Sequence, residues 1–377
     1  MPHEGRDSSA RRNCVAVVGA TGAVGRELLG ILAARGVPRE QVRAIASANS
    51  VGTSIKYGDG SVRVLGLDAA SFAGCRLAVF AADAQTSRRS APIAVAAGAV
   101  VIDNSSAFRL DPGVPLIVPE VNADALETGT KPPRGIVANP NCTTIILVTA
   151  LEPLRRAFGI GAIDIATYQA VSGAGAAAID ELLDTTRRAL GIESHRSDAH
   201  VSIFPEPCAF NVFSHDSAVN PATGVNGEEQ KVIAETRKIW NTPTLRITPI
   251  CVRVPVLRAH TEAITVTLSE PATEHDVRAA LAAGKGLQLV DDRAANRFPT
   301  PRNADGRDDI LVGRLRPDPG EMPDTQGRHR RWCLLACGDQ LRKGAALNAV
   351  QIAEGLGVLP RLGVLPETQI LHSPAPV

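Results

Sequence analysis

The sequence lacks an excess of charge of either sign. Its 377 residues include 40 lysines and arginines against 39 aspartates and glutamates, which gives a formal net charge of +1. A chain of this kind produces no strong overall field, so binding to nucleic acid or to an anionic membrane surface is not expected. Any site for an anion has to be built locally from a few cations.

Long apolar runs are also missing. Nowhere does the chain reach the length of about 18 consecutive apolar residues that a membrane-spanning helix requires. Residues 1–13 are polar and include acids, without the apolar stretch of a secretory signal. We therefore expect no membrane span, a disordered tail over residues 1–13 and a second tail over residues 359–377.

The cysteines do not form the dense, even framework of a secreted disulfide domain. There are seven of them, at scattered positions, and an odd, scattered set is typical of reduced thiols in a cytoplasmic protein. None has neighbouring residues spaced as metal ligands, so we expect no metal site. No internal repeat or low-complexity segment is present either.

What the chain does contain is a nucleotide-binding pattern near its start. An apolar strand leads into "VVGATGAVG" and then into an apolar helix, with Gly19, Gly22 and Gly25 in the turn. Such glycines permit a tight turn and close approach to a pyrophosphate at the helix N-terminus. Further strands are predicted at residues 41–47, 76–82, 99–106 and 115–122, which favours a parallel, doubly wound sheet. We expect an α/β fold with a Rossmann-like dinucleotide-binding domain.

The end of the second predicted strand bears on the coenzyme. An NAD site usually has an acid about 20 residues after the glycines, where it binds the ribose 2′-hydroxyl. Here the strand ends in Ser47-Ala48-Asn49-Ser50. Because no carboxylate opposes a 2′-phosphate, NADP is favoured.

The second half of the chain predicts an α+β domain with a mixed sheet. Strands are expected within residues 162–175, 245–257 and 260–269, and helices over 176–190 and 226–240. Residues 299–331 are rich in proline, glycine and charge, which predicts a long loop region outside the cleft with a short strand at 310–316. A closing helix over 344–357 could return to the first domain.

A single cysteine stands at a conspicuous place. In "GIVANPNCTTIILVTALEPL" a short strand meets Asn139-Pro140-Asn141, and an apolar helix then begins at Cys142. The first turn of a helix lowers the pKa of a thiol and supplies backbone N–H groups for an oxyanion. Although most free cysteines are inert packing residues, this position favours a nucleophile.

Together these segments resemble the aspartate-semialdehyde dehydrogenases. The motifs are "VVGATGAVG", "SSAFR", "VPEVN", "NPNCTT", "TYQAVSGAG", "FPEPCAFNV", "RVPVLRAHTEA" and "LRKGAALNAVQIAE", and they run through residues 14–358. The resemblance implies NADPH-dependent reduction of aspartyl phosphate to the semialdehyde used in lysine, threonine and methionine synthesis. It also implies a cytoplasmic homodimer or homotetramer assembled through the second domain.

The family's functional residues map onto this chain by motif. Cys142 would be the nucleophile, His260 the acid/base residue and Gln169 a substrate-orienting amide. Arg253 would bind the α-carboxylate and Glu228 the amino group, while Arg109 and Lys231 would contact phosphate. The expected coenzyme contacts are Gly19, Thr21, Gly22, Val24, Gly25, Ser47, Asn49, Ser172, Gly173 and Gln340.

Some positions depart from the family pattern. Many relatives have an arginine at Asn49, so the NADP preference could be weaker here, and Gln340 replaces a common asparagine. Arg253 and His260 are seven residues apart, so a continuous strand would point them to opposite faces, and Pro255 has to break that register. We expect an NADP-binding domain formed by residues 14–141 with 344–358, and a catalytic and dimerisation domain formed by residues 142–343.

Two other functions remain open from the sequence. The N-acetyl-glutamyl-phosphate reductases have a similar architecture but typically have glycine before the cysteine, where this chain has Asn141. A nucleotide-sensing or scaffold protein could also keep the fold. The intact set of Cys142, Gln169, Arg253 and His260 argues against a protein without catalytic activity.

Overall fold

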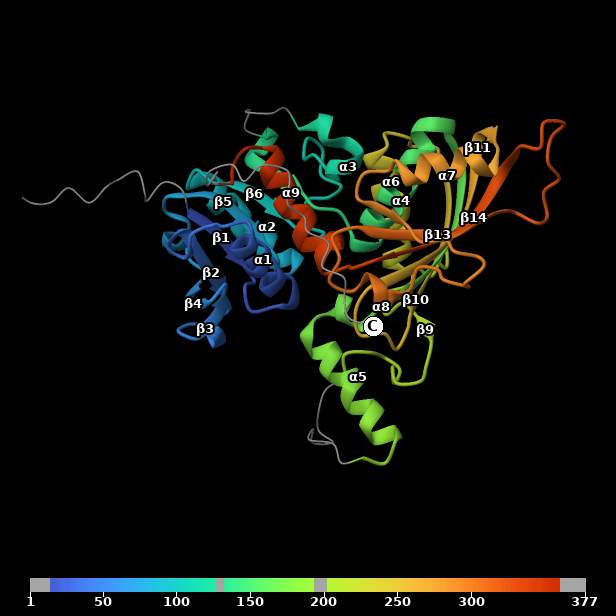
Figure 1. The fold of residues 1–377 in the computed structure, drawn as a ribbon. Coiled ribbons are helices and arrows are strands. Elements are labelled where there is room, and N and C mark those ends of the chain that lie inside the picture. Colours follow the sequence, from blue (N-terminus) through green and yellow to red (C-terminus); the bar gives the residue numbers. More distant parts are fainter. Residues whose placement is uncertain (1–13, 127–131, 193–201, 360–377) are drawn as a thin grey trace, which may run out of the picture.

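The computed structural model describes residues 14–126, 132–192 and 202–359, which form two seven-stranded sheets (Figure 1). The two tails expected from the sequence lie outside the described residues, apart from Leu359. Within the described part of the chain, no helix combines the length and apolar character needed to cross a membrane.

The first sheet carries the nucleotide-binding pattern. Its strand order is β3-β4-β2-β1-β5-β6-β7, and neighbouring strands are parallel except for the β3–β4 pair. The strands are β1 (Cys14–Val18), β2 (Val42–Ala46), β3 (Ser54–Tyr57), β4 (Gly60–Gly66), β5 (Cys75–Phe80), β6 (Val100–Asp103) and β7 (Ile136–Ala138).

Helices cover both faces of this sheet, as predicted for a doubly wound fold. Helix α1 (Ala23–Ala34) and the closing helix α9 (Leu347–Gly355) share a core with Val17, through Leu28 and Val350. On the other face α2 (Ala84–Ala96) packs Ala91 into the core that contains Ala16. The last helix of the described chain therefore returns to the first sheet, where Figure 1 shows α9 beside the N-terminal strands.

The second sheet is mixed, again as predicted. Its order is β12-β13-β14-β11-β8-β10-β9, with parallel pairing in β10–β8 and β12–β13 and antiparallel pairing elsewhere. The strands are β8 (Ile160–Gln169), β9 (Phe213–Ser214), β10 (Arg246–Arg253), β11 (His260–Ala272), β12 (Leu287–Leu289), β13 (Ile310–Pro317) and β14 (His329–Gly338).

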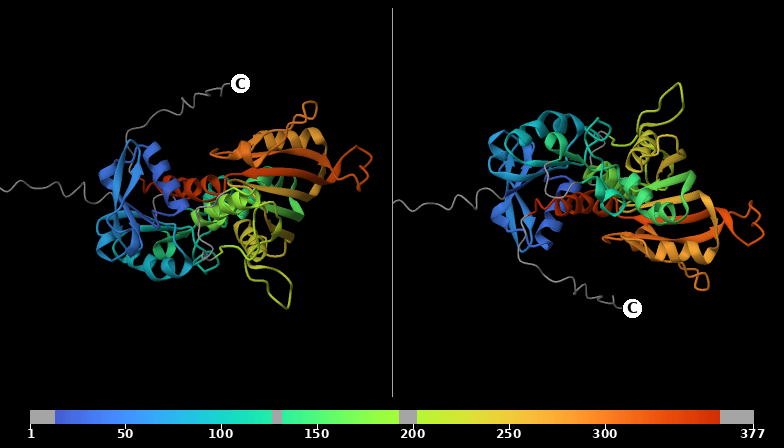
Figure 2. Two further views of the ribbon diagram at one scale, coloured as in Figure 1. Left: turned by 90° about the horizontal axis from the view of Figure 1, so that it is seen from below. Right: turned by 90° about the horizontal axis from the view of Figure 1, so that it is seen from above.

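Helix α4 (Cys142–Phe158) joins the two halves. It is almost entirely buried, and its Ile145 belongs to one continuous core with Ala138 of the first sheet and Ile165 of the second. Helices α6 (Gly227–Ile239) and α7 (Glu274–Ala282) pack beside α4. Helix α5 (Ala176–Ala189) projects from the body, and α8 (Pro301–Ala304) is a single turn (Figures 1 and 2).

The prediction of a strand at residues 115–122 is wrong. In this segment Leu116 makes only an isolated bridge to Ala138, and α3 (Pro119–Asn122) is a short helix. Pro115 and Pro119 have no N–H to donate to a strand ladder, and Pro119 stands at the start of the helix, where that lack costs least.

Other differences concern boundaries and missed strands. The strand expected within 162–175 ends at Gln169, followed by a 3₁₀ turn at Val171–Ala174. The hairpin β3–β4 and strand β14 had not been predicted. The closing helix begins with a π-helical turn, Arg342–Ala346, and such turns are frequent at functional sites.

Candidate active site

Cys142 is the first residue of α4, and Asn141 is the helix N-cap. The side chain of Asn141 accepts a hydrogen bond from the Thr144 N–H at 3.2 Å, which fixes the start of the helix. Cys142 lines a cavity of about 320 Å³. The predicted placement of the thiol in a first helical turn is confirmed.

His260 stands at the start of β11, fully buried, with Nε2 at 3.4 Å from Sγ of Cys142. The backbone N–H of Ala170 donates to Nδ1 of the same ring at 3.0 Å. Because Nδ1 is an acceptor, the neutral ring carries its proton on Nε2, facing the thiol. Burial, together with the charge of Arg253, lowers the pKa of His260 to about 3, so the ring is neutral at physiological pH.

The pKa of Cys142 is shifted in the opposite direction to the one expected from the helix N-terminus. Burial and the negative charge of Glu228 raise it to about 12, although Arg109 and Lys231 act to lower it. Burial disfavours the thiolate more than the nearby cations favour it. At neutral pH the thiol of Cys142 is therefore protonated.

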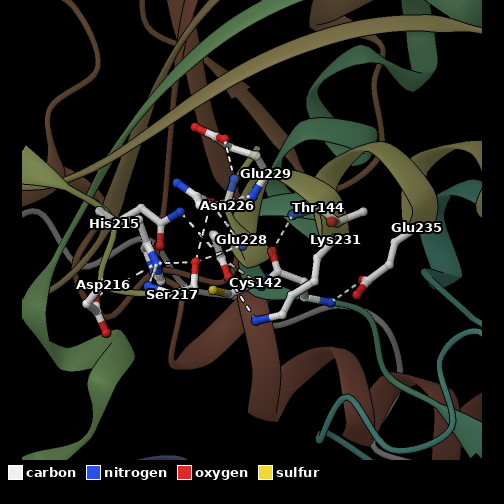
Figure 3. Close-up of polar contacts among 12 residues, drawn as sticks. Cys142, Thr144, His215, Asp216, Ser217, Asn226, Glu228, Glu229, Lys231 and Glu235 are labelled. Carbon is white, nitrogen blue, oxygen red and sulfur yellow. Dashed lines mark hydrogen bonds and ion pairs between the residues drawn. The ribbon is translucent and has the colours of Figure 1, made fainter. Parts of the chain in front are cut away.

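Glu228 and Lys231 lie on one face of α6, as their spacing predicted, beside Cys142 (Figure 3). Glu228 accepts from Lys231 Nζ at 3.1 Å, from Asn141 at 2.9 Å and from Gln169 at 3.3 Å. Burial alone would raise the pKa of Glu228, but Lys231 and the other positive or donating neighbours hold it at about 2. The carboxyl group of Glu228 is therefore ionised at neutral pH.

Arg253 ends β10, and His260 begins β11 on the opposite side of β8. The break in register that both residues need to share a cleft is therefore present. The guanidinium of Arg253 is almost fully buried and donates to Asp216, His215 and the carbonyl of Ala170. Its Cζ atom lies over the ring of Phe204, 5.3 Å from the ring centre.

Arg109 reaches the same cavity from the loop after β6. It is held by Glu235 of α6 at 3.0 Å and by the carbonyls of Asn139 and Asn104 at 2.9 and 2.7 Å. A second carboxylate oxygen of Glu235 accepts the N–H of Asn141 at 2.6 Å. Arg109 is thereby fixed near the N-terminus of α4, where an anion would also meet the positive end of the helix.

The predicted coenzyme residues lie in two places. Gly19, Thr21, Gly22, Val24 and Gly25 form the turn from β1 into α1, and Ser47 and Asn49 follow β2 at the same edge of the sheet. Val24, Gly173 and Gln340 line the cavity, and Ser172 is hydrogen-bonded to Gln340.

The turn between β1 and α1 fits a dinucleotide. A Cβ on Gly25 would lie 2.2 Å from the carbonyl oxygen of Gly19, and one on Gly19, whose φ is +80°, would lie 2.2 Å from that of Ala81. Both positions therefore require glycine. The turn leaves bare backbone at the N-terminus of α1, the feature that binds a pyrophosphate.

Sequence reasoning missed several residues of this cavity. The cavity is also lined by Asn104, His215, Asp216 and Gly344. Glu235 does not line it but accepts a hydrogen bond from Arg109, which does. Glu235 lies seven residues after Glu228 on α6, a helical spacing that could have indicated it. His215 and Asp216 belong to a loop without periodicity, so no signal of this type points to them.

Two other parts of the molecule lie apart from this cavity. None of residues 299–331 line it, in agreement with the expectation that this segment lies outside the cleft. A larger groove of about 1220 Å³ runs between α3, α4, α6 and α7, but none of the predicted site residues line that groove.

Comparisons with known proteins agree with this arrangement. Residues 14–129 match the family model "Semialdehyde dehydrogenase, NAD binding domain", and residues 151–343 match "Semialdehyde dehydrogenase, dimerisation domain". Aspartate-semialdehyde dehydrogenase of Synechocystis sp. is 44% identical over 340 residues, which is 90% of this chain and 96% of that protein. The Bacillus subtilis protein of the same name is 39% identical over 350 residues, 91% of this chain and 96% of the relative.

Solved structures give the same result. The structure of Vibrio cholerae aspartate semialdehyde dehydrogenase II complexed with ASA has a TM-score of 0.83 and 39% identity, and the match covers 92% of this chain and 98% of that one. The Candida albicans enzyme with NADP, at 23% identity and a TM-score of 0.68, shares the fold over 92% of this chain and 99% of its own. The chain therefore belongs to the semialdehyde dehydrogenase family, and within it to the aspartate-semialdehyde dehydrogenases.

Proposed function

We propose that this chain reduces L-aspartyl-4-phosphate to L-aspartate 4-semialdehyde with NADPH, through a thioester on Cys142. The observation that carries the proposal is the position of Cys142 at a helix N-terminus, 3.4 Å from His260 and within one cavity with Arg109, Glu228, Lys231 and Arg253. The product would serve lysine, threonine and methionine synthesis.

The binding groups divide the substrate between them. Arg253 would bind the α-carboxylate, because a guanidinium offers a planar fork to a carboxylate. Glu228, ionised and buried, would meet the amino group. Arg109 and Lys231 would bind the phosphate near the N-terminus of α4. Because the chain has almost no net charge, an anion has to be bound by such local cations. Gln169, beside Glu228, would orient the acyl group.

The chemistry would proceed at Cys142. Its Sγ forms a bond to the acyl carbon as the carbon–oxygen bond to phosphate breaks, and the thiol proton leaves with the phosphate. When bound, NADPH supplies the hydride that reduces the thioester. As the carbon–sulfur bond of the hemithioacetal breaks, the aldehyde carbonyl forms, and the departing sulfur is stabilised by a hydrogen bond from the Nε2–H of His260 and takes up one proton, supplied in net terms by solvent, to restore the thiol. His260 thus donates toward sulfur, and in its resting tautomer it does not accept the thiol proton.

The coenzyme would lie across the edge of the first sheet. The turn formed by Gly19, Thr21, Gly22, Val24 and Gly25 would bind the pyrophosphate, while Ser47 and Asn49 would face the 2′-phosphate. Ser172, Gly173 and Gln340 would contact the nicotinamide end. Residues 14–141 with 344–358 would thus form the NADP domain, and residues 142–343 the catalytic and dimerisation domain.

We further propose a cytoplasmic homodimer formed through the second sheet. Helices cover one face of this sheet, but the other face leaves Tyr168 41% exposed and Ile250 61% exposed on adjacent strands. Apolar side chains on an uncovered sheet face suit a subunit interface. Replacing Ile250 with aspartate is expected to give monomers in light scattering, while the exposed control Glu270→Gln leaves the dimer intact.

The test of the activity is phosphate-dependent reduction of NADP, and in parallel of NAD, with aspartate semialdehyde. We expect turnover that requires phosphate, favours NADP and disappears in Cys142→Ala. Folded wild-type protein that turns over neither coenzyme would contradict the proposed function. N-acetyl-glutamate semialdehyde would then be the next substrate to assay.

A further inference from the structure

The guanidinium of Arg253, to which the proposed function assigns the α-carboxylate of the substrate, is already hydrogen-bonded to a carboxylate of the chain itself, that of Asp216. Asp216 lies in the loop after β9, beside His215 (Figure 3). Its Oδ1 accepts hydrogen bonds from Nη2 of Arg253 at 2.6 Å and from Nε at 3.2 Å. This is the edge of the guanidinium that usually grips a carboxylate with two donors.

The other donors of Arg253 are largely engaged as well. Nη2 also donates to Nε2 of His215 at 2.9 Å, and Nη1 donates to the carbonyl of Ala170 at 3.0 Å. A guanidinium has five N–H donors, so within the part of the chain that the structure describes these four contacts leave a single N–H on Nη1 without an acceptor. A substrate carboxylate therefore cannot bind through two donors unless one resident partner leaves.

Asp216 is the partner best placed to leave. Ala170 is fully buried and its carbonyl belongs to the backbone next to β8. His215 and Asp216 both line the cavity, but the side chain of His215 is only 9% exposed, whereas that of Asp216 is 25% exposed. Burial would raise the pKa of Asp216, but Arg253 holds it below its usual value, so the residue competes as an anion at neutral pH.

We propose that Asp216 is a resident carboxylate that pairs with Arg253 and is exchanged for the α-carboxylate of the substrate. This inference rests on the proposed function and adds a residue that sets substrate affinity. A ligand with a carboxylate replaces the hydrogen bonds that Asp216 gives up. A ligand without one would leave the buried charge of Arg253 without an anionic partner, with only His215 and the carbonyl of Ala170 as acceptors, which is costly, so the exchange selects for carboxylates.

The exchange predicts that Asp216 lowers the affinity for the substrate, because it competes with the substrate carboxylate for Arg253. In Asp216→Asn a neutral amide competes less strongly for Arg253 than a carboxylate does. Asparagine keeps the shape of the side chain and part of its hydrogen bonding, so a difference of about 1 kcal/mol between carboxylate and amide is expected, which corresponds to a change of about five-fold in binding. Lys231 and Arg109 make no contact with Asp216 among the described residues, so phosphate binding should not change.

The experiment measures protection of Cys142 against iodoacetamide by succinate, quantified by mass spectrometry of the Cys142 peptide. Succinate presents a carboxylate to Arg253 but cannot be turned over. We expect half-protection of Asp216→Asn at a succinate concentration about five-fold lower than for wild type. Protection by inorganic phosphate should be the same for both proteins. Asp318→Asn, which removes a surface ion pair with Arg331, is the matched control and should behave as wild type.

A kinetic comparison completes the test. The KM for aspartate semialdehyde should fall by a similar factor in Asp216→Asn, with the KM for phosphate unchanged. Weaker or unchanged protection by succinate in this variant would overturn the inference, as would a failure of succinate to protect wild type. Asp216→Ala serves as the second variant if the asparagine protein does not fold. Absence of turnover in wild type would instead contradict the proposed function, and the protection assay would still decide the role of Asp216.

Discussion

The Sγ atom of Cys142 lies 3.4 Å from Nε2 of His260, on the side of the ring that carries the proton. The hydrogen bond from Ala170 to Nδ1 fixes this tautomer. A neutral ring of this kind can stabilise a thiolate but does not take the proton of a thiol. Since burial raises the pKa of Cys142 to about 12, we expect the free enzyme to react slowly with alkylating reagents at neutral pH.

The first prediction concerns Glu228, whose charge contributes to the raised pKa of Cys142. Glu228→Gln removes that charge, so the thiol pKa should fall and alkylation of Cys142 at pH 8 should accelerate by about ten-fold, the effect of about one pKa unit. The rate is measured by mass spectrometry of the Cys142 peptide. Glu270→Gln, at an exposed position on β11, is the control. An unchanged rate in Glu228→Gln would mean that the charge of Glu228 does not contribute to the raised pKa of the thiol.

A second prediction follows from the π-helical turn that packs against the nucleophile. A Cβ on Gly344 would lie 3.0 Å from Cβ of Cys142, tighter than an ordinary contact. Gly344→Ala should therefore displace the thiol and lower kcat by about ten-fold or more, because small displacements of a reacting group are costly. Circular dichroism should show an intact fold.

Gly30→Ala provides the matched control for that substitution. Gly30 is exposed in the middle of α1, and a Cβ there would have no atom within 4 Å. Alanine at this position should stabilise the protein by about 0.5–1 kcal/mol, because glycine is a poor helix former, and should leave kcat unchanged. Equal kcat values for the two variants would show that the contact between Gly344 and Cys142 has no catalytic role.

Local sequence patterns predicted most of the fold. The glycine turn, the apolar periodicity of α4 and α6, and the proline break between β10 and β11 each depend on neighbours in the chain. Residues 115–122 were misread because their apolar character resembles a strand, and only their prolines argue otherwise. Local chemistry also fixes where α6 begins, through the capping box formed by Asn226 and Glu229. The start of the helix in turn sets the positions of Glu228 and Lys231 within it.

The features that could not be predicted are those created by tertiary packing. The sequence places Cys142 in the first turn of a helix but gives no measure of its burial. The predicted direction of its pKa shift is therefore wrong, because burial raises the pKa that the helix N-terminus alone would lower. Asp216 contacts Arg253 from a loop 37 residues away in the chain, and no periodicity relates the two. The tautomer of His260 likewise depends on Ala170, 90 residues distant.

A third prediction concerns Glu262, which is fully buried in β11 and has no hydrogen-bond partner for either carboxylate oxygen among the described residues. Burial raises its pKa well above the usual value of 4.5, so the folded protein holds this carboxyl protonated. The stability that depends on this proton is present below pH 4.5 and is lost as the pH rises through the folded pKa. Wild type should therefore lose stability relative to Glu262→Gln as the pH increases.

Urea unfolding at pH 4.5 and at pH 8.5 measures this effect. The two proteins should have similar free energies of unfolding at the lower pH. At the higher pH the glutamine variant should be more stable by about 1.4 kcal/mol for each unit by which the folded pKa of Glu262 exceeds 4.5, because wild type must keep its proton or bury a charge that glutamine never carries. The same difference between the two proteins at both pH values would contradict a protonated Glu262.

The last prediction concerns coenzyme preference. Asn49 is exposed in the turn after β2, at the sheet edge where the 2′-phosphate of NADP would lie. An arginine there could bind the phosphate through two donors, so Asn49→Arg should raise kcat/KM for NADP by about ten-fold while that for NAD changes little. Asn49→Gln, which is neutral, is the control, and high salt should reduce the gain of the arginine variant because an exposed ion pair is screened. Equal gains for NADP and NAD would place Asn49 away from the 2′-phosphate.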